Sequence, residues 1–271
     1  MLLYLYKNTN SLSLALPIIT LGQPLIEMVS IDSTNIYANK CIQEGIAVSG
    51  AVYRADFQTS GKGQRTKFWE SEKGQNLLCS YIIEWGTYTN KGLNRPLPQE
   101  QLGFSMAISL GLYAFFNEFV TTDVAIKWPN DLYWRDTKAG GILIDNKMHG
   151  SDWTWSIIGL GVNINQTQFS NEVPNPVSLK QITGKTYDLK VLTQKLSAHL
   201  SNSVNQWIQT DPSSHLTQYN QVLWGKDEKR KFKKQNTSFE ATILGVNEKG
   251  QLILDQGIEQ TYNFGELIWT I

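Results

Sequence analysis

Two segments in which apolar residues recur every three or four positions constrain the fold of this 271-residue chain most strongly. In residues 98–120 the recurring positions are Leu102, Met106, Leu110, Tyr113, Phe116 and Val120. In residues 189–207 they are Leu189, Leu192, Leu196, Leu200, Val204 and Trp207. Because such steps place side chains on one face of an α-helix, each segment predicts an amphipathic helix with one buried face. Pro212 is expected to end or restart the second helix.

Short runs rich in Val, Ile, Leu and Tyr surround these helices and predict β-strands. The runs span residues 46–55, 76–84, 124–134, 140–146 and 153–164. Strands and helices do not alternate strictly along the chain, as they would in a parallel α/β sheet. The order therefore predicts an α+β fold.

The last part of the chain, residues 225–271, differs in character from the rest. Short apolar runs near residues 239–244, 252–254 and 267–271 lie between glycines, which predicts a small β-barrel. The basic run at residues 226–234 is interpreted as a solvated face, with docking of an acidic protein or contact with nucleic acid as the alternatives. We therefore expect three parts: an N-terminal extension (1–25), a large domain (26–224) and a small domain (225–271).

Composition excludes several classes of protein. The 24 basic and 24 acidic residues cancel, which argues against a dedicated DNA-binding protein. Cys41 and Cys79 lie far apart and are expected to be reduced core thiols, and the three histidines are too scattered to suggest a metalloenzyme. No run among the first 31 residues approaches the roughly 18 apolar residues of a membrane span, and no signal peptide is evident. A cytoplasmic location without a membrane partner is expected.

A polar stretch at residues 56–74 carries the first sign of chemistry. It is too long for a hairpin turn, and loops of this length are usually functional. Gly61 and Gly63 allow the backbone to approach a ligand, while Lys62, Arg65 and Lys67 add positive charge. Exposed N–H groups beside cations predict an anion site, although a solvated basic turn is the alternative on these residues alone. The spacing is not that of a P-loop.

A second block, residues 126–132, places a cation, an aromatic ring and two oxygen-bearing side chains where a strand ends. Pro129 interrupts strand pairing, and Asn130 and Asp131 follow it. These two residues fit an ordinary Asx turn. They equally fit a site that holds Mg²⁺ together with phosphate, because this ion prefers oxygen ligands.

Glycine pairs mark two further blocks. Lys138 precedes Gly140 and Gly141 at the start of an apolar run, and Gly159 and Gly161 lie just before Asn163. Either pair alone would indicate no more than a strand in which glycine relieves crowding. The presence of all four blocks in one chain favours a ligand-binding site over four unrelated turns and strands.

Together, these blocks resemble the biotin protein ligases of the short type, which lack an N-terminal DNA-binding domain. The matching segments are Asp32-Ser-Thr-Asn35, the loop 58–69, Ser71-Glu-Lys-Gly-Gln-Asn76, and residues 126–132, 138–143 and 159–163. The resemblance covers residues 26–271. It implies a mixed sheet flanked by helices, as in class II synthetases, followed by a small SH3-like β-barrel.

The resemblance also implies a reaction. Such a ligase uses ATP and Mg²⁺ to activate biotin as biotinyl-5′-AMP, and then transfers biotin to a lysine of a biotin carboxyl carrier protein. Two anions must be brought together in the first step, so cations are expected to offset their repulsion. The loop is expected to close over the adenylate and shield it from water. No nucleophile from the enzyme is needed, which agrees with the lack of a Ser-His or Cys-His pair.

Residue roles are carried over position by position. Biotin contacts are expected at Ser33, Thr34, Asn35, Gln58, Gly61, Lys62, Gly63, Gln64, Lys138 and Gly141. ATP or adenylate contacts are expected at Arg65, Trp69, Lys127, Asn130 and Asn163. The expected catalytic cations are Lys62, Lys127 and Lys138, and the expected Mg²⁺ ligands are Asn130 and Asp131.

This chain departs from the family pattern in the loop, which often reads Gly-Arg-Gly-Arg-Arg-Gly. Lys62 and Gln64 replace two arginines, and Thr66 replaces the last glycine. Gln64 cannot make a charged contact with phosphate, which weakens the expectation that it retains the adenylate.

Three other functions compete with this interpretation. A lipoate ligase would share the fold, but Asp32-Ser-Thr-Asn35 favours a polar ring over an aliphatic chain. A biotin-sensing repressor needs a helix-turn-helix, for which the residues before Asp32 are too few and too apolar. A non-catalytic biotin-binding module would not need the three lysines. The resemblance also allows a homodimer.

Overall fold

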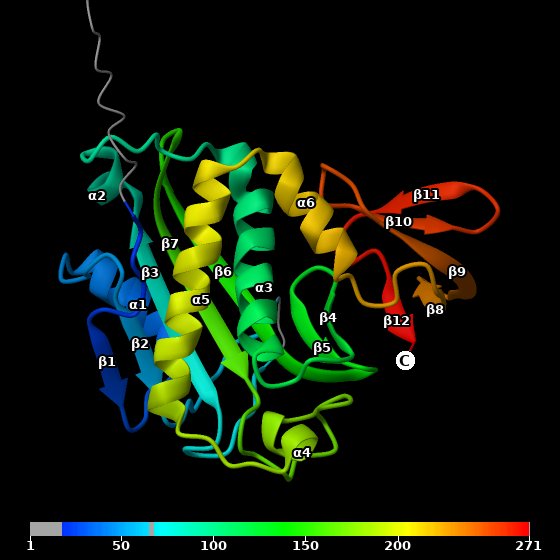
Figure 1. The fold of residues 1–271 in the computed structure, drawn as a ribbon, viewed down its shortest axis with the longest axis horizontal. Coiled ribbons are helices and arrows are strands. Elements are labelled where there is room, and N and C mark those ends of the chain that lie inside the picture. Colours follow the sequence, from blue (N-terminus) through cyan, green and yellow to red (C-terminus); the bar gives the residue numbers. More distant parts are fainter. Residues whose placement is uncertain (1–17, 65–67, 271) are drawn as a thin grey trace, which may run out of the picture.

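The computed structural model describes residues 18–64 and 68–270, which form a large sheet with helices and a smaller C-terminal sheet (Figure 1). Most of the predicted N-terminal extension, residues 1–17, lies outside the described residues. Its last residues pack on the large domain: Ile19 and Leu21 are buried, and their N–H groups donate to Asn205 and Ser201 at 2.8 and 2.9 Å. Among the described residues, no helix combines the length and apolar character needed to span a bilayer.

The large sheet has seven strands in the order β1-β2-β3-β7-β6-β5-β4. They are β1 (Leu25–Met28), β2 (Val52–Ala55), β3 (Leu77–Glu84), β4 (Val124–Lys127), β5 (Asp131–Trp134), β6 (Thr137–His149) and β7 (Asp152–Val162). β1 runs parallel to β2, and the other neighbouring pairs are antiparallel. The mixed sheet that the resemblance implies is thus confirmed.

Two long helices cover one face of this sheet (Figure 1). They are α3 (Gln101–Asn117), preceded by the 3₁₀ turn η1 (Pro98–Glu100), and α5 (Leu189–Gln209). Both predicted helices are confirmed, and α5 has the single buried face that its spacing predicts. The prediction of one buried face is wrong for α3, which has no exposed residue: Leu102, Met106 and Leu110 pack on the cluster shared with the small sheet, and the opposite side of the helix faces the main core. That core includes Trp85, Phe104, Trp153 and Trp207. These rings lie 5.3–6.4 Å apart between centroids, within the range of favourable edge contacts.

Four shorter or less apolar elements complete the large domain. They are α1 (Thr34–Gln43), α2 (Trp85–Thr89), α4 (Leu179–Thr183) and α6 (Pro212–Gln221). α1 covers the sheet face opposite α5, where Ala38 and Cys41 pack against Tyr53, Ile82 and Ile157. α6 begins at Pro212, so this proline restarts a helix, as a residue without an N–H can do in a first turn.

The smaller sheet has five strands in the order β11-β10-β9-β8-β12. They are β8 (Lys229–Lys234), β9 (Thr237–Val246), β10 (Leu252–Asp255), β11 (Glu259–Tyr262) and β12 (Ile268–Thr270). Its core continues into the large domain, because Phe232 and Ile243 belong to one buried cluster with Met106, Ile126 and Tyr219. Within the described residues no pairing joins β11 to β12, and a closed SH3-like barrel stays a prediction. The three-part division of the chain also stays a prediction.

Some expected boundaries shift for clear reasons. The run 124–134 forms two strands, β4 and β5, which pair with each other on either side of Pro129. The run 46–55 is extended only from Val52 onward. The basic run belongs to β8, where the alternation of a strand buries Phe232 and exposes Lys231 and Lys233. Helix α1 was not predicted because its polar sequence lacks a clear apolar stripe.

Candidate active site

Three glycines, Gly141 of β6 and Gly159 and Gly161 of β7, leave part of one face of the large sheet without side chains, and we call this part the glycine floor. Asp131 of β5 lies opposite Gly141, and Gly141 lies opposite Gly161. Two residues earlier on β7, Gly159 lies opposite Ser80 of β3. Residues paired across strands share a face, and so do residues two apart on one strand, so all five positions face the same side.

This floor lies on the same face as α1 and receives side chains from two other segments. Ile157, two residues before Gly159, packs under α1. A Cβ at Gly159 would overlap Asn35, and a Cβ at Gly161 would overlap the ring of Trp69. The glycines are therefore required for side chains, and for any ligand, to approach the sheet this closely.

Four polar side chains form a hydrogen-bonded cluster beside Gly159, which we call the polar cluster: Thr34, Asn35, Gln58 and Ser80. Gln58 Oε1 accepts from the Thr34 N–H at 2.7 Å and from Thr34 Oγ1 at 3.0 Å. Ser80 Oγ lies 2.7 Å from Thr34 Oγ1 and hydrogen-bonds to Asn35 Oδ1. Asn35 Nδ2 donates to the carbonyl of Leu143 at 3.3 Å. The cluster thus presents donors and acceptors that are held in place before any ligand arrives.

The start of α1 explains how Thr34 and Asn35 reach the sheet. Ser33 is the N-cap residue, in extended conformation and 2% exposed, and its N–H donates to Asp32 Oδ1 at 2.6 Å. The first helical residues therefore point their side chains inward. Ser33 itself makes no side-chain cap and stays a predicted biotin contact.

The loop 58–69, which carries Gly61, Gly63 and the basic residues and which we call the glycine-basic loop, returns to the glycine floor at Trp69. The Trp69 N–H donates to the Gly61 carbonyl at 3.0 Å, and a Cβ at Gly61 would overlap the Trp69 carbonyl. Lys62 is exposed and lies opposite Phe68, while Gly63 is half-buried. Arg65 lies outside the described residues, so its predicted adenylate contact is open.

Trp69 is the side chain that covers the floor. Its ring lies on Gly161, with Lys138 Nζ 5.8 Å from the ring centroid. Its indole N–H is buried and has no hydrogen-bond partner among the described residues. Because a buried N–H without a partner costs free energy, this donor marks a place for a ligand acceptor.

Lys138 and Asp131 form an ion pair at the other end of the floor. Lys138 Nζ lies 2.7 Å from Asp131 Oδ1, and the two side chains are 27% and 31% exposed. The backbone of Lys138 is tied down as well, since its N–H donates to the carbonyl of Asn175 at 2.6 Å. Asn163 supports this region by donating through Nδ2 to the carbonyl of Val177 at 3.2 Å.

Lys127, expected to lie near phosphate, extends into a cage of aromatic rings. Its Nζ lies 4.9, 5.5 and 5.0 Å from the ring centroids of Tyr133, Trp224 and Trp269, respectively. Nζ also donates to the Tyr133 hydroxyl at 3.2 Å. Burial raises the pKa of Tyr133 above its usual value, with the charge of Asp131 adding to the effect, so this hydroxyl stays protonated. The cage joins β4 to the C-terminal strand β12.

The residues that follow Lys127 are hydrogen-bonded to the small sheet and to α6. Trp128 Nε1 donates to the Gly250 carbonyl at 3.0 Å, and Tyr219 donates to the Pro129 carbonyl at 2.8 Å. Asn130 is 6% exposed and donates to the Ile142 carbonyl at 2.6 Å. The segment 127–131 is thus packed against the small sheet, α6 and β6, and it ends at Asp131 beside the glycine floor.

A cavity of about 320 Å³ lies between the loop and the small sheet. Gln64 lines it from the loop, Trp128 and Pro129 from the segment 127–131, and Lys249 and Phe264 from the small sheet. Two of these three parts, the loop and the segment 127–131, contain residues that the sequence associates with ATP, whereas the small sheet was given no such role.

Few side chains in the site could bind a metal ion. Among the described residues no group of three or more His, Cys, Asp or Glu side chains could enclose an ion. Mg²⁺ bound with a nucleotide needs only one or two protein oxygens, because phosphates and waters fill the other positions. Asp131, with Asn130 beside it, fits that requirement.

Half of the predicted site residues lie in two groups. The first is the polar cluster with Gly61, and the second joins Asp131, Lys138 and Gly141 to Trp69. Lys62 and Lys127 belong to neither group through the contacts described above. Sequence reasoning missed Ser80 and Trp269. A single serine inside the apolar run Leu77–Glu84 was the available signal for Ser80, whereas nothing near Trp269 indicated the Lys127 cage.

Comparisons with known proteins agree with this architecture. The BirA protein of Salmonella typhimurium, named a bifunctional ligase/repressor, is 28% identical over 242 residues, which cover 88% of this chain and 71% of that protein. The biotin--[acetyl-CoA-carboxylase] ligase of Mycobacterium tuberculosis is 24% identical over 185 residues, 66% of this chain and 64% of the relative. The structure of the biotin protein ligase from Aquifex aeolicus in complex with biotin and ATP superposes with a TM-score of 0.71 at 22% identity. That match covers 91% of this chain and 98% of the Aquifex chain, and it shows a common fold.

The family model is the most direct comparison. The model for the biotin/lipoate A/B protein ligase family matches residues 27–163, which include the polar cluster, the loop, the segment 127–131 and the glycine floor. This match spans half of the chain. The chain therefore belongs to the biotin/lipoate A/B protein ligase family.

Proposed function

We propose that this protein is an ATP-dependent biotin protein ligase that forms biotinyl-5′-AMP and transfers biotin to a lysine of a biotin carboxyl carrier protein. The observation that carries the proposal is the polar cluster at one end of a glycine floor whose other end holds Lys138 and Asp131. Such a site suits an elongated acid with a polar ring at one end and a carboxylate at the other.

The polar cluster favours biotin over lipoate. The ureido ring of biotin has two N–H donors and one carbonyl acceptor, and Asn35, Gln58 and Ser80 offer side-chain groups that complement both kinds. The ring of lipoate has no hydrogen-bonding N–H or carbonyl. Burying these polar groups under it would leave some unsatisfied, at about 1–3 kcal/mol for each.

The opposite end of the site suits formation of the adenylate. The carboxylate of biotin attacks the α-phosphorus of ATP, a P–O bond forms, and pyrophosphate leaves with the electron pair of the bond that breaks. The Lys138 ammonium, oriented by Asp131, offsets the repulsion between the two anions and stabilises charge on the phosphoryl oxygens. The unpartnered indole N–H of Trp69 is available to donate to an oxygen of the adenylate.

The predicted Mg²⁺ site fits the residues at this end. Asp131 and Asn130 would hold the ion together with the phosphates of ATP, and the bound ion would neutralise part of the triphosphate charge. Lys127 supports the same segment from its aromatic cage. The exposed Lys62 would approach the phosphates when the loop closes over the nucleotide.

In the second step the amine of an acceptor lysine attacks the biotinyl carbonyl, a C–N bond forms and AMP leaves. The chain needs no nucleophile of its own for this step. We include a cytoplasmic location and a homodimer in the proposal. The homodimer is supported by β6, whose residues after Ile142 pair only with β7 among the described strands, so that one edge of this part of the strand has no strand partner there.

Transfer of biotin to a carrier domain tests the proposal. Purified protein, ATP, Mg²⁺ and biotin are incubated with an isolated biotin carboxyl carrier domain, and the mass of the carrier is measured. We expect one added biotinyl group on a single lysine. No mass increase with biotin, but one with lipoate on a lipoyl domain, would overturn the substrate assignment.

A further inference from the structure

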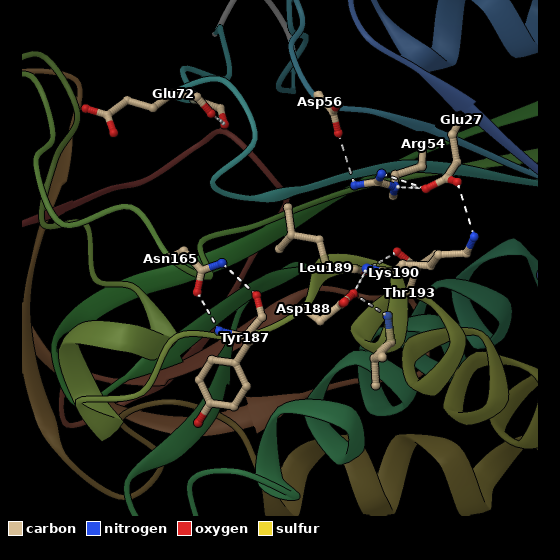
Figure 2. Close-up of polar contacts among 12 residues, drawn as sticks. Glu27, Arg54, Asp56, Glu72, Asn165, Tyr187, Asp188, Leu189, Lys190 and Thr193 are labelled. Carbon is tan, nitrogen blue, oxygen red and sulfur yellow. Dashed lines mark hydrogen bonds and ion pairs between the residues drawn. The ribbon is translucent and has the colours of Figure 1, made fainter.

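We infer that Arg54 is a positioning residue that clamps together the two chain segments from which three of the four polar-cluster residues come. The inference rests on the proposed function, because it concerns how the biotin ring is recognised. Arg54 is the third residue of β2, and its side chain is only 11% exposed (Figure 2). A cation this well buried needs anionic partners nearby.

Arg54 has two carboxylate partners on two different segments. Its Nη2 and Nε lie 2.7 and 3.2 Å from Glu27 Oε1, and its Nη1 lies 3.2 Å from Asp56 Oδ1 (Figure 2). Glu27 belongs to β1, and Asp56 is the first residue after β2. The planar guanidinium can hold both carboxylates at once in a fixed geometry, which the single ammonium of a lysine cannot do.

These segments lead directly to three of the four members of the polar cluster. From Glu27 the chain continues through residues 28–32 to Thr34 and Asn35, and from Asp56 it continues to Gln58. The two stretches run side by side: Asp56 N–H donates to the Met28 carbonyl and Ile31 N–H to the Phe57 carbonyl, at 2.9 and 3.1 Å. The Gln58–Thr34 hydrogen bonds then join their ends.

Asp56 also closes the base of the glycine-basic loop. The Gly74 N–H donates to the Asp56 carbonyl at 2.8 Å, so the loop leaves and re-enters the fold at this residue. A fixed Asp56 therefore sets the direction in which the chain departs toward Gln58 and Gly61.

Arg54 acts without touching the ligand site. It pairs across β2 and β3 with Cys79, a member of the core beneath α5, whereas the next residue, Ser80, faces the glycine floor. Alternation along the strand thus places Arg54 on the opposite face of the sheet from the polar cluster. Its effect on biotin must pass through the backbone of the two segments.

One neighbouring cation supplies a matched control. Lys190, near the start of α5, lies 3.6 Å from Glu27 Oε2 and is 60% exposed (Figure 2). Lys190 belongs to the same ionic network, but it connects Glu27 to α5 and not to Asp56. Removing its charge should leave the clamp intact.

The test measures biotin affinity by calorimetry for Arg54→Met, Asp56→Asn, Glu27→Gln and Lys190→Gln, with kinetics of adenylate formation alongside. We expect Arg54→Met, Glu27→Gln and Asp56→Asn each to weaken biotin binding about tenfold, the typical result of losing a hydrogen bond to a charged group. KM for biotin should rise while kcat and KM for ATP hold. Lys190→Gln should bind biotin like the unaltered protein.

Several outcomes would overturn the clamp. Wild-type biotin affinity in both Arg54→Met and Asp56→Asn would do so, as would an equal rise in KM for biotin and for ATP. If Arg54→Met does not fold, Glu27→Gln decides with Asp56→Asn, because Glu27→Gln keeps Arg54 but removes the charge that ties it to β1. Failure of the proposed function is a separate result: the unaltered protein would then show no biotin binding at all.

Discussion

The two ends of the site are built in different ways. At the polar cluster, Thr34, Gln58 and Ser80 are hydrogen-bonded to one another, and every partner comes from the large domain. The other end holds the Lys138–Asp131 ion pair and is the end that we propose binds phosphate. Beside it, Lys127 lies among aromatic rings, one of which, Trp269, belongs to the small sheet. The first end is specified by hydrogen-bond geometry and the second by packing between two sheets.

Under the proposed function, this difference assigns ring recognition to one end and chemistry to the other. A polar cluster preformed within one domain can bind its ligand ring with little rearrangement. A phosphate end that depends on Trp128, Tyr219 and the small sheet is sensitive to changes far from the reacting atoms. The following predictions test whether the two ends respond independently.

The largest effect is expected for Lys138→Ala. Loss of this cation should lower the rate of adenylate formation by about 2–4 kcal/mol in transition-state free energy, roughly 30- to 1,000-fold, with biotin-ring recognition kept. Single-turnover kinetics and calorimetry with biotin measure the two quantities. Lys147→Ala is the matched control, since Lys147 lies on the same strand and is paired with Asp145 at the same 2.7 Å distance. Near-normal rates for Lys138→Ala would remove Lys138 from the site.

Gly159→Ala should affect the opposite end. The added methyl group overlaps Asn35, and overpacking of this kind costs about 1–3 kcal/mol, which predicts a loss of biotin affinity of about tenfold or more. Equilibrium dialysis with labelled biotin measures it. Gly86→Ala is the control, because the nearest atom to its new Cβ is the flexible Arg95 side chain at 3.8 Å. Unchanged biotin affinity in Gly159→Ala would show that no ligand depends on this part of the floor.

Trp269→Leu tests the dependence on the small sheet. Removing one wall of the cage takes away a cation–π contact of about 0.5–2 kcal/mol, so KM for ATP should rise a few-fold. Affinity for biotin should not change, because the polar cluster has no partner in the small sheet among the described contacts. Equal losses for both substrates would contradict the division between the two ends.

The smallest effect concerns the pH dependence of stability. The hydrogen bond from Arg54 holds the pKa of Glu27 below its usual value. A carboxylate with a lowered pKa in the folded state stabilises the protein above the pKa of the unfolded chain, and this contribution is lost as the pH falls through the folded pKa. The difference in free energy of unfolding between the unaltered protein and Glu27→Gln should therefore shrink from about pH 7 to about pH 3. Urea unfolding across this range measures it, and a constant difference would contradict the Arg54–Glu27 pairing.

Much of the framework was predictable because its signals are local. The three- and four-residue spacing in residues 189–207 depends only on one face being buried, and α5 follows it. The same spacing in residues 98–120 predicted a helix correctly but not its burial, because α3 is enclosed on all sides. The break at Pro129 depends on a missing N–H and appears as the turn between β4 and β5. The glycine pairs, taken together with the other blocks, predicted a close approach to the backbone, and three of these glycines form the glycine floor.

The remaining features depend on contacts between distant parts of the chain. Ser80 joins the site only because β3 lies beside β7, and Trp269 reaches Lys127 only because β12 pairs with β8. Helix α1 forms over β2, β3 and β7 although its sequence carries little apolar periodicity. Arg54 carries no signal of its own in the sequence, because Glu27 lies beside it only through the pairing of β1 with β2.

Exchange of labelled pyrophosphate into ATP tests the central claim most directly, because it reports reversible adenylate formation without a carrier protein. The exchange is run with biotin, with lipoate and without either acid, each with the unaltered protein and with Lys138→Ala. We predict exchange that depends on biotin and is lost in Lys138→Ala. Exchange with lipoate alone, or none with either acid, would contradict the assignment of the polar cluster to biotin and of the glycine floor to its adenylate.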